Sequence, residues 1–283
     1  MRHETAASPG LYEIRPMTSA EFESIRQLAF DSCGMDFPDS KKEMIASRLD
    51  RTLRRLSLTS YQEYYCYVRD DSSGRALREF IDALATNHTN FLREGEHFAF
   101  LREKFGRVSF RGRPIRIWSA ACSTGEEPYS IAMTLLDQRK HEMIPGFEIL
   151  ASDISTRALE AARSGVYPID RLRDLPPFWL ATFFETGTGK WAGWMKVRRA
   201  IGEIVRFERF NLLDSPAEFG NFDVIFCRNV MLYFGRPTQE GIVNRLAERL
   251  QPGGYLFTGH TESLMGIRHG LSYIQPAIYQ RRP

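Results

Sequence analysis

Apolar residues in the second half of the chain come in short runs, and each run leads through a polar turn into residues at helical spacing. The first run covers 115–118; small residues at 119–123 follow, Gly125 permits a tight turn, and 126–136 continue as a helix. Further strands are predicted at 147–152, 203–210, 222–227, 255–258 and within 271–280, and further helices at 156–164 and 239–250. This alternation predicts an α/β fold, with a mostly parallel sheet and helices on both sides.

The first part of the chain instead repeats apolar residues every three or four positions, as amphipathic helices do. Thr18 and Glu21 have the spacing of a capping box, and Gly34 stands where the first helix would end. Further helices are predicted at 41–56, 61–68, 76–84 and 98–105. We therefore predict a mobile tail (1–17), a small N-terminal helical domain (18–106), a basic linker (107–114) and an α/β domain (115–283).

One interruption of the α/β pattern, residues 166–202, is too long for a simple connection. It holds three of the four tryptophans, and Gly187-Thr188-Gly189 precede Trp191 and the alternating residues 195–198. These features predict an inserted antiparallel β-subdomain with a glycine-tipped hairpin. The hairpin either covers the edge of the sheet or holds a peptide by strand addition, with aromatic side chains as anchors.

Composition and cysteine usage narrow the class of protein. Of 283 residues, 43% are hydrophobic and 26% charged, as in ordinary globular proteins. The four cysteines are scattered without a C-x-x-C pair, which argues against a zinc site and a disulfide framework. No secretory signal and no run of ~20 apolar residues is present. We expect a reduced, cytoplasmic protein without a metal site.

Positive charge is concentrated on the predicted helix at 41–56, although the net charge of the chain is only +3. At 100° per residue, Lys41, Arg48, Arg51 and Arg55 lie beside the apolar face of this helix. Such a stripe is either a solvated surface or a docking site for an acidic partner.

Carboxylates mark the predicted ligand site. Glu126 and Glu127 stand where a phosphate-binding loop would present bare amides or a lysine, so this loop favours a ligand with positive charge. Asp153 ends the second strand, where an acidic side chain commonly binds ribose hydroxyls of NAD or S-adenosylmethionine. Neither G-x-G-x-x-G nor G-x-x-x-x-G-K-[ST] is present, which disfavours NAD and nucleoside triphosphates.

Five stretches, in order along the chain, resemble the bacterial chemoreceptor glutamate methyltransferases of the CheR type. They read A-T-N-H-T-N-F-L-R-E (85–94), W-S-A-A-C-S-T-G-E-E-P-Y-S (118–130), A-S-D-I (151–154), F-D-V-I-F-C-R-N-V-M-L-Y-F (222–234) and G-G-Y-L-F-T-G-H-T-E (253–262). The resemblance covers roughly residues 18–280. It departs locally at Ala85-Thr86, where two threonines are common, and at Leu92, where a second phenylalanine is common.

The resemblance implies a helical domain followed by a class I, Rossmann-like S-adenosylmethionine-dependent methyltransferase domain with the inserted β-subdomain. It implies that Arg93 and Tyr233 lie beside the reacting atoms. The residues that would contact the cofactor, of which S-adenosylhomocysteine is the product form, are Asn87, Thr89, Arg93, Glu127, Asp153, Asn211, Leu212, Asn229 and Val230. The substrate would be glutamates of the cytoplasmic region of chemoreceptors, docked on Lys41, Arg48, Arg51 and Arg55.

The resemblance also implies recruitment to membrane receptor arrays, in some members through a receptor tail peptide held by the β-subdomain. Two alternatives remain. A nucleic-acid amino-methyltransferase is suggested by the basic helix and by Asn229 four residues before Tyr233, although V-M-L between them does not match the Asn-Pro-Pro-Tyr type. A non-catalytic adaptor is the other, and the intact set of Glu127, Asp153 and Asn229 argues against it.

Overall fold

The computed structural model describes residues 14–105, 113–139 and 146–282, which form two compact units divided after Ala85. The division comes earlier than the boundary expected near residue 107, because helix α5 (Gly95–Phe105) packs into the core of the second unit. Most of the predicted tail and of the predicted linker at 107–114 lies outside the described residues. No helix in the described ranges is long and apolar enough to cross a membrane.

The first unit is helical, as predicted. The capping box forms, since the Thr18 side chain accepts from the Glu21 amide and Glu21 from the Thr18 amide, and Gly34 ends the helix with φ 74°. Ile45, Leu49 and Leu53 are fully buried on one face of α2. The helices are α1 (Ser19–Cys33), α2 (Lys42–Leu56), α3 (Tyr61–Asp70) and α4 (Arg75–Leu84), with a 3-10 turn η1 (Asp39–Lys41).

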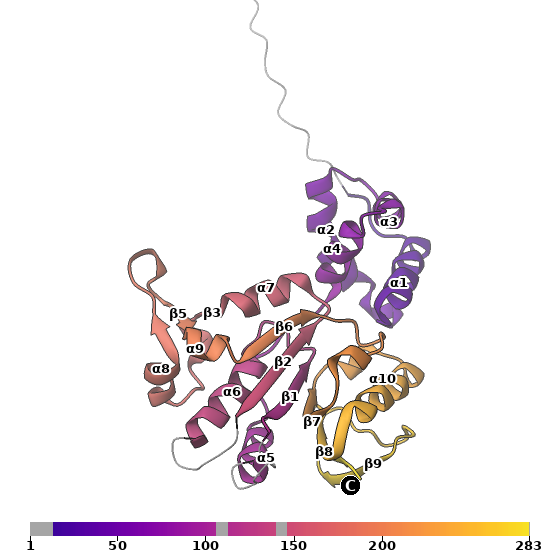
Figure 1. The fold of residues 1–283 in the computed structure, drawn as a ribbon. Helices are drawn as coiled ribbons and strands as arrows, with labels where there is room; N and C mark the ends of the chain where they lie inside the picture. Colours follow the sequence, from indigo (N-terminus) through magenta and orange to yellow (C-terminus); the bar gives the residue numbers. More distant parts are fainter. Residues whose placement is uncertain (1–13, 106–112, 140–145, 283) are drawn as a thin grey trace, which may run out of the picture. The chain divides into compact units, whose positions relative to one another are not determined.

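The second unit is built on a seven-stranded sheet in the order β6-β2-β1-β7-β8-β10-β9 (Figure 1). The first five strands in that order are parallel, and the last two pair antiparallel. The strands are β1 (Ile115–Ala120), β2 (Phe147–Asp153), β6 (Val205–Arg209), β7 (Phe222–Cys227), β8 (Leu250–Phe257), β9 (Leu271–Gln275) and β10 (Ile278–Arg281). The main helices beside α5 are α6 (Glu126–Arg139), α7 (Thr156–Ser164) and α10 (Arg236–Arg249).

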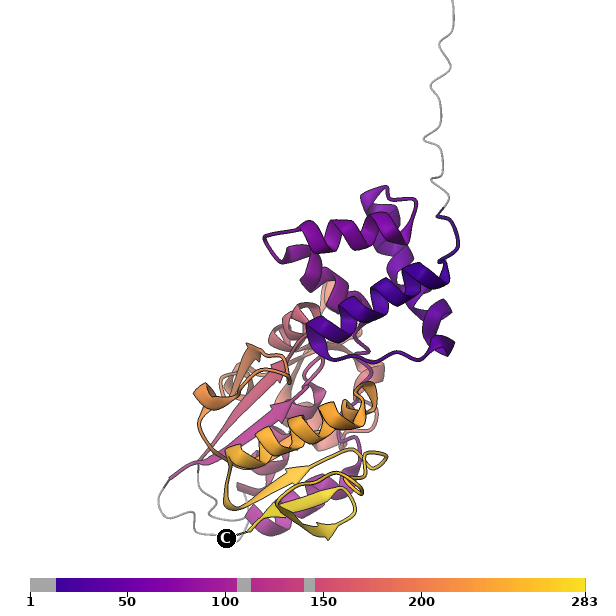
Figure 2. The ribbon, with the colours of Figure 1, turned by 90° about the vertical axis from the view of Figure 1, so that its right-hand side faces the viewer.

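Alternate residues of β1 enter two different cores, because successive side chains of a strand point to opposite faces. Ile115 and Ile117 join the apolar cluster that includes residues of α5 and α6. Trp118 and Ala120 join the cluster that includes residues of α10. Helices therefore cover both faces of the sheet, and α10 lies beside β8 in both views (Figures 1 and 2).

One boundary differs from the sequence prediction. Pro252 and Gly253 were expected to close the helix at 239–250, but they lie inside β8, which begins at Leu250. The register between β7 and β8 shifts between Phe222 and Val224, so the extra residues form a bulge. Proline is tolerated at such an irregularity because the ladder there lacks a regular hydrogen bond.

The interruption at 166–202 folds as a separate antiparallel sheet in the order β3-β5-β4, as predicted. The Gly187 amide donates to the Trp194 carbonyl at 2.8 Å and closes the hairpin. A Cβ at Gly187 would lie 2.3 Å from the Trp191 carbonyl oxygen, so only glycine fits there. Its elements are β3 (Val166–Pro168), α8 (Pro177–Phe183), β4 (Phe184–Thr186), β5 (Trp194–Val197) and α9 (Arg199–Gly202).

Candidate active site

The polar residues singled out in the sequence lie where parallel strands end. Asp153 is the last residue of β2, Glu127 lies in the first turn of α6 after β1, and Asn211 and Asn229 follow β6 and β7. Because neighbouring parallel strands end at the same edge of the sheet, these residues share that edge. Ligands of open α/β sheets bind there.

Asp153 ties two of these strand ends together. Its side chain is 7% exposed and accepts from the backbone amides of Ser123 at 2.8 Å and Ser155 at 2.9 Å. The carboxylate therefore fixes the loop between β1 and α6 against the start of α7, which begins at the Ser155 cap.

Backbone strain is concentrated at the same edge. Seven non-glycine residues of the described chain have positive φ, and five of them lie in the strand-end loops or in the segment 86–94. These five are Leu92, Glu94, Ala121, Ser123 and Asn229, with φ between 51° and 69°. Such conformations cost energy and cluster at functional sites, which indicates that this edge is built for a ligand.

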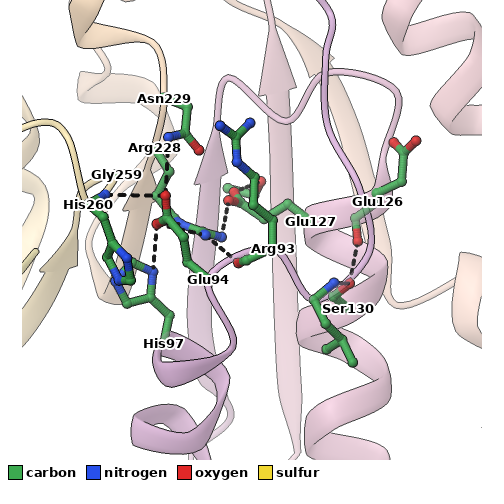
Figure 3. A network of polar contacts seen from close by, with 12 residues as sticks. Arg93, Glu94, His97, Glu126, Glu127, Ser130, Arg228, Asn229, Gly259 and His260 are labelled. Atoms are coloured by element: carbon green, nitrogen blue, oxygen red, sulfur yellow. Dashed lines mark hydrogen bonds and ion pairs between the residues drawn. The ribbon is translucent and has the colours of Figure 1, made fainter. Parts of the chain in front are cut away.

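Arg228 is the centre of a buried ionic network (Figure 3). Its side chain is only 2% exposed and contacts Glu94 and Glu127 at 3.0 Å each, and it also donates to the Arg93 carbonyl. Glu127 accepts a further bond from the Ser119 hydroxyl at 2.7 Å, and Glu94 accepts from the Asn229 side chain at 3.3 Å. The network thus joins the segment 86–94, β1, α6 and the end of β7.

The two carboxylates of this network differ electrostatically. Burial raises the pKa of Glu127, although Arg228 and the Ser119 hydroxyl act in the opposite direction. Burial also acts to raise the pKa of Glu94, but Arg228 and the donors from His260 and Asn229 lower it overall. Arg228 is therefore the charge that allows both carboxylates to lie in this dry setting.

Glu262 shapes the turn that follows β7. Its buried carboxylate accepts from the backbone amides of Asn229 at 2.6 Å and of Met231 and Gly259 at 2.7 Å. A Cβ at Gly259 would lie 2.5 Å from the Asn229 side-chain nitrogen, so glycine is required for this close approach. Glu262 thus positions Asn229 and the 3-10 turn η5 (Met231–Tyr233).

The segment 86–94 lies along the first turns of α6 and α7. The Leu92 amide donates to the Ser130 hydroxyl at 3.0 Å, and the Asn87 side chain lies 3.5 Å from the Ser155 hydroxyl. The Thr89 carbonyl accepts from Arg171, and the Arg93 guanidinium donates to the His88 carbonyl at 3.1 Å. The predicted residues of this segment therefore reach the same edge as Asp153.

The other residues predicted to contact the cofactor or the reacting atoms lie after the ends of β6 and β7. Asn211 accepts from the Leu213 amide at 3.1 Å, and the Leu212 carbonyl accepts from Arg245 at 3.0 Å. Val230 precedes η5, and Tyr233 at its end is half-buried. Glu126, although adjacent to Glu127, points away from the network and pairs with Arg171 at 3.6 Å (Figure 3).

The basic residues predicted to dock the substrate lie in the first unit. Arg48 donates to the Leu84 carbonyl and Arg55 pairs with Glu79, both within that unit. Lys41 and Arg51 are exposed. Of the four predicted residues, Lys41 in η1 and Arg51 in α2 therefore best represent the outward positive charge.

One group of metal-ligand type occurs among the described residues. Ligand atoms of Glu94, His97 and His260 lie within 4.8 Å of one another. The same Glu94 oxygen, however, accepts two bonds from Arg228, whose positive charge opposes a cation at this point. Burial, with the charge of Arg228, lowers the pKa of His97 to about 3, so this ring is neutral.

Sequence reasoning missed three residues that organise the site: Glu94, Arg228 and Glu262. Each lay inside a stretch that carried the resemblance, but none was assigned a role. A local signal exists for Arg228, since a charged residue directly after the fully apolar end of β7 is unusual unless it is paired.

The carboxylates of this site fit a ligand with hydroxyl groups and positive charge. Asp153 is an acceptor at the position from which ribose hydroxyls are bound, and Glu127 adds a second carboxylate at the first loop. No lysine or arginine side chain belongs to the loop 119–127, so it offers no charge for a phosphate. S-adenosylmethionine, with a ribose, an ammonium and a sulfonium, meets these requirements.

Comparison with known proteins also indicates a protein that binds S-adenosylmethionine. Residues 20–85 match the family model of the CheR methyltransferase all-alpha domain, and residues 87–279 match that of the CheR methyltransferase SAM binding domain. The chain is 41% identical over 265 residues to the chemotaxis protein methyltransferase of Salmonella typhimurium, covering 93% of this chain and 90% of that one. It is 40% identical over 263 residues to chemotaxis protein methyltransferase 2 of Pseudomonas aeruginosa, covering 93% of each. The chain belongs to the CheR methyltransferase family.

Proposed function

We propose that the protein transfers a methyl group from S-adenosylmethionine to glutamate side chains of a chemoreceptor, giving glutamyl methyl esters. The observation that carries this proposal is the anionic strand edge of a chain of this family: Asp153 holds the loop after β1, and Glu127 pairs with buried Arg228, whose other partner Glu94 accepts from Asn229. Chemotaxis proteins are the relatives, which supports a receptor as the substrate.

Within this proposal, the Asp153 carboxylate accepts hydrogen bonds from the ribose hydroxyls. Glu127 and Asn229 hold the positively charged end of the cofactor. Asn87, Thr89 and Arg93 approach from the segment 86–94. The remaining contacts come from the residues that follow β6 and β7: Asn211, Leu212 and Val230.

The chemistry needs little from the protein beyond placement. When bound, S-adenosylmethionine supplies an electrophilic methyl group. The glutamate carboxylate has an ordinary pKa of ~4.3, so it is ionised at neutral pH and no general base is required. Tyr233 and Arg93 orient this carboxylate, and the buried edge excludes water, which favours a step in which charge is neutralised.

A labelling experiment separates the three classes of function. The protein is incubated with methyl-labelled cofactor and either a receptor cytoplasmic fragment or nucleic acid. Base-labile label on the receptor is expected. Label on nucleic acid would favour an amino-methyltransferase, and no label on either would favour an adaptor.

The exposed cations Lys41, in η1, and Arg51, in α2, are proposed to dock an acidic helical substrate. The double reversal Lys41→Glu and Arg51→Glu is expected to reduce methylation at least severalfold, because like charges then face the substrate. Arg55 is avoided, since a glutamate there would face Glu79. Initial rates are measured on a receptor fragment over a series of roughly 50 to 500 mM salt. Added salt should slow the wild type, because exposed charges are screened within ~10 Å at 0.1 M.

Arg69→Glu is the matched control for these cations, since Arg69 is an exposed arginine of the same unit on α3. It is expected to leave the rate unchanged. Cofactor affinity, measured by calorimetry, should be the same in all variants. Equal rates for the double variant and wild type across the salt series would make the stripe a plain solvated surface.

The inserted sheet is proposed to hold a receptor tail peptide. Its outer strands β3 and β4 present main-chain groups along its edges, and Trp191 and Trp194 are 52% and 40% exposed, whereas Trp179 is buried. Tethering through a short flexible linker raises the local substrate concentration to roughly millimolar. A tailed receptor is therefore expected to be methylated faster than a truncated one at low concentration, with equal rates at saturation.

Titration of free tail peptide gives the direct test of this tether. Trp191→Ala should weaken peptide binding, whereas Phe178→Ala, which removes an aromatic ring of similar exposure (53%) on α8, should not. No measurable peptide binding, together with identical rates on both receptors, would leave the hairpin as a cover for the sheet.

A further inference from the structure

Two large apolar side chains are exposed on the turns that follow β7 and β8. Leu232, in η5, is 57% exposed, and Met265 is 83% exposed. Leu232 directly precedes Tyr233, the residue proposed to orient the substrate carboxylate. The two side chains are defined here as the apolar lip of the site.

Hydrogen bonds and core packing fix the backbone on which the apolar lip stands. Glu262 accepts from the backbone amide of Met231 at 2.7 Å, and Arg236 donates to the Met265 carbonyl at 3.2 Å. Next to Met265, the Leu264 side chain is buried in the core under α10. The backbone is thus fixed on both turns while Leu232 and Met265 face solvent, so their exposure is not the result of a loosely attached loop.

We propose that the apolar lip contacts the substrate helix, on the apolar residues three or four positions from the glutamate that is methylated. This inference rests on the proposed function and names the feature of the substrate that selects the reactive glutamate. Side chains at those spacings share one face of a helix with the glutamate, so a helix that presents its carboxylate to Tyr233 also presents them.

The surroundings fit an acidic amphipathic helix. Arg236 and Arg268 flank the lip; Arg268 is 94% exposed and pairs with Glu240 at 3.5 Å. Leu232 and Tyr233 are neighbours in the same turn, η5, so the lip begins next to the residue proposed to orient the substrate. Methionine adapts its unbranched side chain to different apolar partners, which suits an enzyme that acts on several positions of a helix.

The test is the double variant Leu232→Ser and Met265→Ser, assayed on a receptor fragment. Loss of the apolar contact is expected to raise KM about tenfold, while kcat, cofactor affinity and the thermal midpoint stay near those of the wild type. Tyr273→Ser on β9 is the matched control, because Tyr273 is 63% exposed and lies outside the site. This control should leave KM unchanged.

A substrate variant completes the test. In a receptor fragment, the apolar residues three and four positions from one methylated glutamate are replaced with serine. This change should raise KM for wild-type enzyme and have little additional effect on the double variant, as expected for a shared contact. Unchanged KM in the double variant, or additive effects of the enzyme and substrate changes, would overturn the inference. Wild-type enzyme that esterifies no receptor glutamate would instead overturn the proposed function itself.

Discussion

Replacing Arg228 with methionine is expected to lower the free energy of unfolding by about 3–5 kcal/mol. The substitution puts an unbranched apolar side chain in place of the arginine, but it leaves Glu94 and Glu127, with side chains 13% and 12% exposed, without their shared cation. Two buried carboxylates then lie close together. Urea unfolding monitored by circular dichroism measures the effect, and S-adenosylmethionine binding should fall with it because the network carries the site.

Arg199→Met is the matched control, since Arg199 and its partner Glu203 lie 2.7 Å apart with side chains 91% and 60% exposed. An exposed pair contributes about 0–1 kcal/mol, so this variant should unfold close to wild type. Adding Glu94→Gln to Arg228→Met should restore part of the loss, because one of the unpaired charges is removed. Equal stability of Arg228→Met and Arg199→Met would refute the role assigned to the network.

Asp153→Ala is expected to weaken S-adenosylmethionine binding on the order of 10- to 100-fold, which corresponds to about 1–3 kcal/mol for a charged hydrogen-bonding group. Two effects add: the proposed ribose acceptor is lost, and the Ser123 and Ser155 amides lose the carboxylate that accepts from them. Isothermal calorimetry of the purified protein measures the dissociation constant.

Two variants separate these effects of Asp153. Asp153→Asn retains one acceptor oxygen and should bind with intermediate affinity. Asp214→Ala removes an exposed aspartate beyond the end of β6 and should bind like wild type, which controls for net charge. Unchanged cofactor affinity in Asp153→Ala would falsify the ribose role.

Local patterns predicted the elements well because each depends on neighbouring residues. The capping box at Thr18, the apolar face of α2 and the strand–loop–helix unit around Gly125 are all encoded within one or two turns. The bulge in β8 was missed for a related reason. Pro252 and Gly253 usually end a helix, and only pairing with β7 shows that they lie in a strand.

Long-range pairing could not be predicted from one sequence. Glu94 and Arg228 are 134 residues apart, and Glu262 lies 33 residues from Asn229, so nothing local identifies them as partners. For the same reason α5 was assigned to the wrong unit of the chain: its period shows an apolar face, but not which core buries that face. The position of Asp153 at the end of β2, in contrast, could be predicted, because the end of a strand is a local property of the sequence.

Locating the transferred methyl group tests the central claim most directly. A receptor cytoplasmic fragment is incubated with the protein and S-adenosylmethionine, digested and sequenced by mass spectrometry, with and without mild base. The account predicts one added methyl on glutamate side chains, lost in base and absent when those glutamates are replaced with alanine. Methyl groups on another residue type, or none on a fragment that a chemotaxis methyltransferase of a related bacterium does methylate, would contradict it.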